Sequence, residues 1–183
     1  MDRFNEIKEQ YDAYYTSLLK QGRLLAKDTG VGFWGPSVSD EVYAAFKKLK
    51  LGNYSNFLDL GSGDGKVAMI AALFCKQATG VEYDSMLTGK AMEMKEKIGV
   101  YNAHFINDDF FNHDLSAYDI IFHAPDKPLH RGVEEKLLKE MNGKLILYGH
   151  HFHPTNLRKE KEFTVNGTLV SVYTKPRADR SHL

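Results

Sequence analysis

A glycine-rich turn follows a short apolar segment near residue 60, with acidic residues on both sides. The segment reads Phe57-Leu58-Asp59-Leu60-Gly61-Ser62-Gly63-Asp64-Gly65-Lys66. Glycines let the backbone turn sharply and let a ligand approach without meeting a Cβ. Glu82, at the end of the next apolar segment, is suited to accept hydrogen bonds from two ribose hydroxyls. These residues predict a site for a nucleoside-containing ligand.

A third acidic position, Asp108-Asp109, follows a later apolar segment and precedes Phe110. Carboxylates beside an aromatic ring suit an adenine amino group and its π-face. The NAD fingerprint requires a glycine at the sixth position of the turn, where this chain has Lys66. A P-loop requires Ser or Thr after that lysine, and Val67 stands there instead. Both phosphate-binding alternatives are therefore disfavoured.

Hydrophobic periodicity indicates the elements that must position these residues. From residue 56 onward, short apolar strands alternate with amphipathic helices, which is typical of an α/β fold with a doubly wound, mostly parallel Rossmann-like sheet. The expected strands cover residues 57–60, 78–81, 103–106, 119–123 and 144–148, and the expected helices cover 66–75, 85–98 and 133–141. Asn166-Gly167, between two apolar alternations, predicts an antiparallel hairpin at the C-terminal edge.

Two helices are expected before the sheet. Apolar residues from Phe4 to Leu25 recur at three- and four-residue steps, which predicts a helix of about six turns that ends near Gly30. Pro36 then opens a second helix, over residues 38–49. The apolar face of the first helix could pack on its own domain or on a second copy of the chain, and the sequence does not choose between them.

Composition limits the class of protein. The 183 residues are 43% hydrophobic and 26% charged, which is ordinary for one globular domain. Lys plus Arg and Asp plus Glu number 24 each, so no overall positive field favours a nucleic-acid partner. A single cysteine, Cys75, fits a reducing compartment. With no signal peptide and no membrane span of roughly 18 apolar residues, we expect a cytoplasmic protein without a membrane partner.

The motifs resemble a known family. FLDLGSGDGK, Gly80-Val81-Glu82-Tyr83-Asp84 and Asn107-Asp108-Asp109-Phe110 are similar, in order and spacing, to the first three motifs of class I S-adenosylmethionine-dependent methyltransferases. The resemblance implies S-adenosylmethionine as cofactor. It places Asp59, Gly61 and Gly63 around the methionine part, Glu82 at the ribose, and Asp108 or Asp109 with Phe110 at the adenine. The remaining motif residues assigned to this site are Ser62, Gly65 and Tyr83.

The acceptor site is expected at His123-Ala124-Pro125-Asp126, after the fourth strand. Amide and nucleobase methyltransferases usually carry Asn/Asp-Pro-Pro-Tyr/Phe there, and this chain departs from that pattern. Phe33-Trp34-Gly35-Pro36-Ser37, the glycine block and a Lys-rich helix look like those of compact archaeal and mitochondrial protein-lysine methyltransferases. The resemblance implies that a lysine amine is methylated. Asp126 or His123 would assist or orient the amine, and Trp34 and Pro125 would line its channel.

Several alternatives stay open. The chain could instead methylate a small molecule, or bind the cofactor without catalysis as a partner subunit. His150, His151 and His153 could converge with His123 to shape the acceptor pocket or act as a base, but their loop spacing is nonspecific and no metal is expected.

The chain is expected to have three parts. These are an N-terminal helical extension or lid (1–35), the S-adenosylmethionine-binding methyltransferase domain (36–176) and a polar tail (177–183). Residues 151–159 leave little room for a helix between the fifth strand and the hairpin. Without a large insertion to enclose a small acceptor, either the N-terminal helices supply a lid or the substrate is a macromolecule with its own surface, and a protein substrate is favoured.

Overall fold

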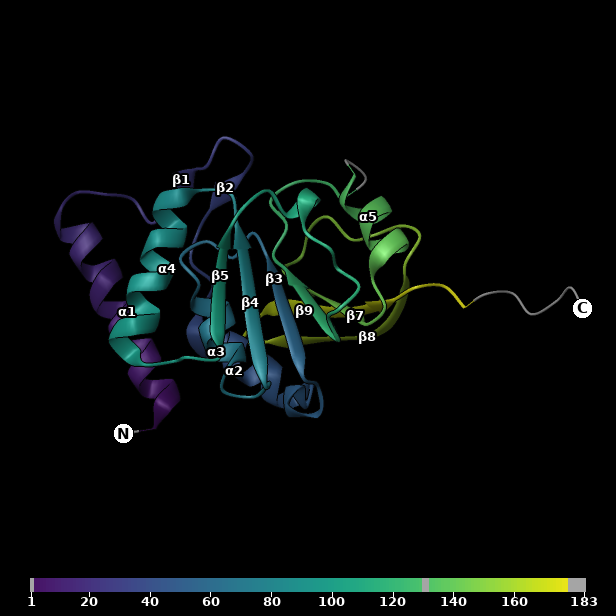
Figure 1. Cartoon of the computed structure of the whole chain (residues 1–183), viewed down its shortest axis with the longest axis horizontal. Coiled ribbons are helices and arrows are strands. Elements are labelled where there is room, and N and C mark those ends of the chain that lie inside the picture. The colour runs from purple at the N-terminus through teal and green to yellow at the C-terminus, as the bar shows by residue number, and fades with distance from the viewer. Residues whose placement is uncertain (1, 130–131, 178–183) are drawn as a thin grey trace, which may run out of the picture.

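A seven-stranded mixed sheet forms the centre of the molecule in this computed structural model, which describes residues 2–129 and 132–177. The strand order is β5-β4-β3-β6-β7-β9-β8, and only the contacts of β9 with β7 and β8 are antiparallel (Figure 1). The arrangement confirms the predicted α/β fold with its C-terminal hairpin. The strands are β3 (Asn56–Leu60), β4 (Gln77–Glu82), β5 (Ala103–Asn107), β6 (Ile120–His123), β7 (Lys144–Tyr148), β8 (Arg158–Val165) and β9 (Thr168–Thr174).

Five α-helices and two 3-10 turns accompany the strands in the described residues. They are α1 (Arg3–Lys20), α2 (Ser39–Lys48), α3 (Lys66–Ala71), α4 (Ser85–Ile98), α5 (Val133–Glu140), η1 (Leu51–Asn53) and η2 (Phe110–Asn112). The prediction that the first helix continues to Gly30 is wrong. Gly22 takes a left-handed conformation after Lys20, and the N–H of Arg23 turns back to the Leu18 carbonyl. This glycine-based cap ends the helix before Leu25.

Buried side chains lie on both faces of the sheet. Along β6, Ile120 and Phe122 belong to one apolar cluster, which α1 to α4 also enter, whereas Ile121 belongs to a second cluster that contains Leu137 of α5. This alternation follows from the two-residue period of a strand. The buried face of α1 packs in the first cluster, so that helix covers its own domain. Figure 1 shows α1 beside α4.

A short hairpin that the sequence pattern did not predict follows α1. Its strands are β1 (Lys27–Asp28) and β2 (Phe33–Trp34), and the N–H of Thr29 donates to the Gly32 carbonyl at 2.8 Å to close the turn. We call residues 27–37 the strap. In Figure 1 the hairpin lies at the top of the molecule, above the sheet.

The connection from β7 to β8 contains no helix, as the sequence predicts. In the described part of the chain, no helix is both long and apolar enough to cross a membrane. The predicted polar tail lies outside the described residues from position 178 onward.

Candidate active site

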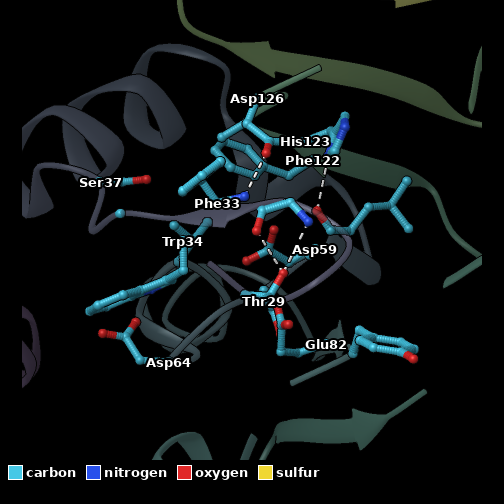
Figure 2. Close-up of a pocket in the computed structure, with 18 of the residues that line it drawn as sticks. Thr29, Phe33, Trp34, Ser37, Asp59, Asp64, Glu82, Phe122, His123 and Asp126 are labelled. Atoms are coloured by element: carbon cyan, nitrogen blue, oxygen red, sulfur yellow. Dashed lines mark hydrogen bonds between the residues drawn. The ribbon is translucent and has the colours of Figure 1, made fainter. Parts of the chain in front are cut away.

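A cavity of about 840 Å³, including its open mouth, lies where β3, β4 and β6 end and where the strap crosses them (Figure 2). The wall combines the glycine turn, the ends of β4 and β6, and the strap. Its polar and aromatic members include Thr29, Phe33, Trp34, Ser37, Asp59, Ser62, Asp64, Lys66, Glu82, Tyr83, Phe110, Phe122, His123 and Asp126.

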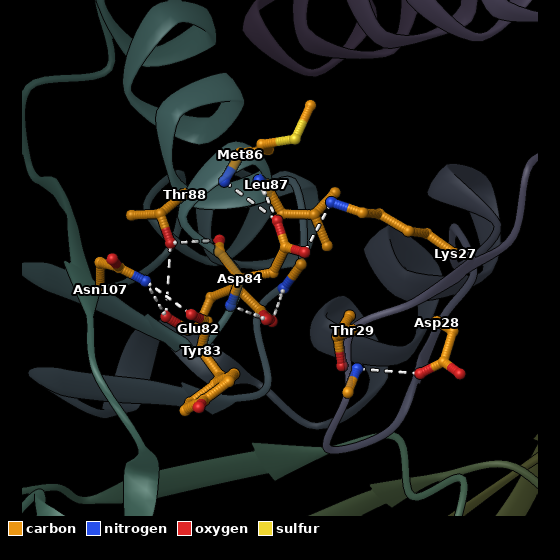
Figure 3. A network of polar contacts seen from close by, with 12 residues as sticks. Lys27, Asp28, Thr29, Glu82, Tyr83, Asp84, Met86, Leu87, Thr88 and Asn107 are labelled. Carbon is orange, nitrogen blue, oxygen red and sulfur yellow. Dashed lines mark hydrogen bonds and ion pairs between the residues drawn. The ribbon is translucent and has the colours of Figure 1, made fainter.

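Glu82 fastens the glycine turn to β4. One of its carboxylate oxygens accepts the Gly63 N–H at 2.8 Å. The other accepts the Asp84 N–H at 2.8 Å, and Figure 3 shows Glu82 beside Asp84. The side chain is buried and lines the cavity. Each oxygen keeps a second acceptor site, because a carboxylate offers about four in all. Glu82 can therefore position the turn and still accept the ribose hydroxyls of the cofactor.

Asp59, at the floor of the cavity, is buried at 3% exposure, and no described residue donates a hydrogen bond to its carboxylate. Burial, together with the charges of Glu82 and Asp64, raises its pKa well above the ordinary value. A buried carboxylate that faces a cavity without a donor fits a cationic ligand group. The ammonium and sulfonium of S-adenosylmethionine supply such groups.

This arrangement predicts that cofactor binding releases a proton. The raised pKa leaves Asp59 protonated in the cofactor-free protein at pH values below it, and a bound cation lowers that pKa. Affinity for S-adenosylmethionine should therefore rise with pH and level off above the raised pKa. Calorimetric titration in two buffers of different ionisation enthalpy measures the released proton. Asp59→Asn should abolish that release, and a wild-type protein that releases no proton at any pH would contradict the assignment.

The first helix holds the glycine turn through Asp64. The Tyr15 hydroxyl donates to the Asp64 carboxylate at 2.7 Å, and the Tyr11 hydroxyl donates to the Asp64 backbone carbonyl at 2.7 Å. All three residues are buried. The tyrosines were predicted only as part of an apolar helix face, because periodicity does not reveal where a phenol hydroxyl ends.

Tyr15→Phe should destabilise the protein by roughly 1–3 kcal/mol, because the mutation leaves a buried carboxylate oxygen without its donor. Urea unfolding followed by circular dichroism measures this change. Tyr14→Phe on the same helix is the matched control, because Tyr14 is only partly buried and no hydrogen bond contributes to its pKa. Equal stability of the two variants would show that the Tyr15–Asp64 contact does not stabilise the fold.

Lys66 places a buried cation beside this contact. The residue is 3% exposed, its Nζ lies 4.6 Å from the centre of the Tyr15 ring, and burial lowers its pKa. No described carboxylate lies within ion-pair distance of Nζ, although the residue lines the cavity. Such an ammonium can hold the carboxylate of the methionine part of the cofactor. The sequence signal was present, since a lysine directly follows the last glycine of the turn.

His123 is the last residue of β6, and a hydrogen bond fixes the tautomer of its imidazole ring. Its Nδ1 lies 2.9 Å from the Leu60 carbonyl oxygen, which can only accept, so Nδ1 carries the proton. The edge of the ring meets Phe110, with ring centres 6.1 Å apart. Burial lowers the pKa of the imidazole, which keeps the ring neutral. Its Nε2 therefore offers a lone pair.

The Asp126 carboxylate binds the backbone of the strap. One of its carboxylate oxygens accepts the Phe33 N–H at 2.6 Å, and the neighbouring Lys127 ammonium donates to the Val31 carbonyl at 2.6 Å. A Cβ on Gly32 would lie 2.8 Å from an oxygen of Asp126, so the close approach needs glycine. Figure 2 shows this contact at the same end of the cavity as His123.

Trp34 covers the glycine turn. A Cβ on Gly63 would lie 2.3 Å from Cδ1 of the indole, and the backbone of Gly63 is left-handed at φ 55°. The indole also approaches Tyr15, with ring centres 6.4 Å apart. Trp34 therefore forms a wall of the cavity, and the Cδ1–Nε1 edge of its indole contacts the glycine turn.

The other predicted residues divide into two groups. Tyr83, Phe110, Gly61 and Ser62 line the cavity. Those that the structure does not bring to its wall are Gly63, Gly65, Asp108, Asp109 and Pro125. Gly63 donates to Glu82 and contacts Trp34, Gly65 packs against Ala91 and Phe105, and Asp109 caps η2 by accepting the Phe111 N–H at 3.0 Å.

The histidines after β7, which are His150, His151 and His153, do not line the cavity with His123. The Nε2 atom of His150 lies 2.8 Å from the Gly167 carbonyl oxygen, and His153 Nδ1 lies 2.8 Å from the Tyr173 hydroxyl, both on the C-terminal hairpin. Among the residues that the structure describes, no cluster of three metal-binding side chains occurs.

Methyltransferases are among the solved structures with a similar fold. An RNA methyltransferase from Salinibacter ruber in complex with S-adenosyl-L-homocysteine is 21% identical at a TM-score of 0.68, over 81% of this chain and 98% of that one. The putative methyltransferase yhhF from Escherichia coli is 18% identical at a TM-score of 0.56, over 72% and 82%. A precorrin-6y C5,15-methyltransferase from Geobacter metallireducens is 13% identical at a TM-score of 0.59, over 77% and 90%. At these identities the likeness shows the shared fold.

No curated protein matches the sequence. A family model does match, with the description "Histone methylation protein DOT1", over residues 31–124. That stretch runs from the strap through the glycine turn and Glu82 to the end of β6. Because the match spans just over half of the 183 residues, the chain belongs to the DOT1 family of methylation proteins and is an S-adenosylmethionine-dependent methyltransferase.

Proposed function

We propose that the protein methylates the side-chain amine of a protein lysine. The observation that carries this proposal is the charge of the cavity. Four acidic side chains line it, those of Asp59, Asp64, Glu82 and Asp126, against the single ammonium of Lys66 among the described lining residues, and Asp59 becomes a carboxylate when a cation binds. Such a wall attracts cationic groups and repels phosphate. The description of the family model, which names histone methylation, supports the same class of acceptor.

Different lining residues would bind different parts of the cofactor along the cavity. Asp59 and Lys66 would hold the charged ends of the methionine part, and Glu82 would hold the ribose, next to Tyr83 and Phe110. When bound, S-adenosylmethionine supplies a methyl group that its sulfonium already activates. The protein then has to align the acceptor and keep a lone pair on it.

His123 is better placed than Asp126 to remove the proton from the acceptor amine and so leave its lone pair free. A lysine amine has a pKa near 10.4, so it must give up a proton before it attacks. The Nε2 atom of neutral His123 can accept that proton, while Asp126 already binds the backbone of Phe33. We therefore assign the acceptor amine to the His123 end of the cavity.

The motif Phe33-Trp34-Gly35-Pro36-Ser37 supports the finer proposal that the enzyme resembles compact archaeal and mitochondrial protein-lysine methyltransferases. In this structure the motif forms the end of the strap, and all five residues line the cavity. It therefore contributes directly to the site in which cofactor and acceptor meet.

A labelled methyl donor tests the acceptor class. The enzyme is incubated with S-adenosylmethionine that carries a radioactive methyl group, and with core histones, total RNA or free lysine in separate reactions. We expect label in protein and none in RNA. Reactions without enzyme give the background. Label in RNA alone would overturn the proposal and favour the activity named for the Salinibacter structure.

A further inference from the structure

Two apolar side chains of the strap face solvent at the mouth of the cavity. Val31 is 48% exposed and Phe33 is 67% exposed, and both also line the cavity. Trp34, the next residue, is partly buried and contacts the glycine turn. Exposed side chains of this size cost free energy in water, so a contact that covers them is favourable.

The strap cannot easily move these side chains out of solvent, because two contacts hold its backbone and a third holds the side chain of its first residue. The Phe33 N–H donates to Asp126 (Figure 2), and the Lys127 ammonium donates to the Val31 carbonyl. The Lys27 ammonium pairs with Asp84 at 2.6 Å (Figure 3). The first two contacts join the strap to the loop after β6, and the third joins it to the loop after β4. The exposed position of Val31 and Phe33 is therefore part of a fixed arrangement.

We propose that Val31 and Phe33 form an apolar edge that binds an apolar side chain of the substrate protein, next to the lysine that is methylated. The proposal rests on the proposed lysine methyltransferase function. The edge adjoins the His123 end of the cavity, and the carboxylates of the wall attract the lysine itself. The occupant that fits is a protein segment in which an apolar residue accompanies the acceptor lysine.

Two peptides that differ only beside the lysine test the edge. One carries leucine on each side of the acceptor lysine, and the other carries serine, with the same length and charge. For the wild-type enzyme, kcat/KM should be about tenfold higher with the leucine peptide, as expected when one apolar side chain is partly buried. In the double variant Val31→Ser/Phe33→Ser, this ratio should fall to near one.

Tyr101→Ser is the matched control, because Tyr101 is an aromatic residue with 69% exposure that does not line the cavity. It should keep the wild-type ratio. S-adenosylhomocysteine is titrated into each variant to show that the cofactor site is intact. Equal use of both peptides by the wild-type enzyme, or an unchanged ratio in the double variant, would overturn the apolar edge alone. Cofactor binding without methylation of either peptide would overturn the lysine function as well.

Discussion

Replacing His123 by phenylalanine should lower kcat for methylation of a lysine acceptor by about 10²- to 10⁴-fold at neutral pH. The variant loses the Nε2 lone pair that we assign to the acceptor amine. It also loses the Nδ1–H donor that contacts the Leu60 carbonyl, while the apolar contact with Phe110 remains possible. A methylation assay that is quenched at several time points, with saturating cofactor and peptide, measures kcat.

The dependence of kcat on pH separates a catalytic role of His123 from a structural one. Burial lowers the pKa of His123, although the Leu60 carbonyl and the Asp126 charge act in the opposite direction. The wild-type enzyme therefore keeps the basic form as pH falls through the ordinary histidine range, and it loses activity only below the lowered pKa. Burial also shifts the pKa values of Asp59, Asp64 and Lys66 further along the cavity. The pH profile of Asp59→Asn therefore serves as a reference in which the titration of Asp59 is absent.

As pH approaches the pKa of lysine, free amine becomes abundant and the deficit of His123→Phe should shrink. His123→Asn, which can still donate to the Leu60 carbonyl, controls for folding. A deficit that stays constant at all pH values in both variants would contradict a role in proton acceptance.

Glu82→Ala should weaken S-adenosylhomocysteine binding by about 10- to 150-fold, which corresponds to roughly 1.5–3 kcal/mol for hydrogen bonds to a charged group. The variant removes the acceptor for the ribose and also releases the Gly63 and Asp84 N–H groups. Because the turn loses its link to β4, we expect the larger end of this range. Calorimetric titration measures the affinity.

Glu82→Gln controls for the role in the turn, because its amide oxygen can still accept one of the two N–H groups. We expect an intermediate affinity for this variant and a melting temperature closer to the wild-type value. Wild-type affinity in Glu82→Ala would show that this carboxylate is not part of the cofactor site.

Local patterns account for what the sequence predicted well. The glycine turn, Glu82 and the alternating strands each depend on neighbouring residues and on the two-residue period, and β3 to β9 lie near their expected positions. The end of α1 was misjudged because Leu25 continued the apolar spacing, whereas Gly22 and the Arg23 N–H decide where the helix stops. Periodicity does not report such a cap.

Contacts between distant residues account for what could not be predicted. Asp126 has the chemistry of a general base in the sequence, but its carboxylate binds Phe33, which lies 93 positions earlier. Tyr15 reads as one more apolar residue of a helix, yet its hydroxyl reaches Asp64, 49 positions later. The two-residue strands of the strap are too short to show a period, and these long-range contacts fix them in place.

Tandem mass spectrometry of a methylated protein substrate tests the central claim most directly. The substrate is treated with the enzyme and an isotopically labelled S-adenosylmethionine, then digested, and each labelled residue is located in its peptide. We predict the label on lysine side-chain nitrogen, with an apolar residue close to that lysine. Label on other residue types, with unlabelled lysines, would contradict the account of the acceptor site at His123.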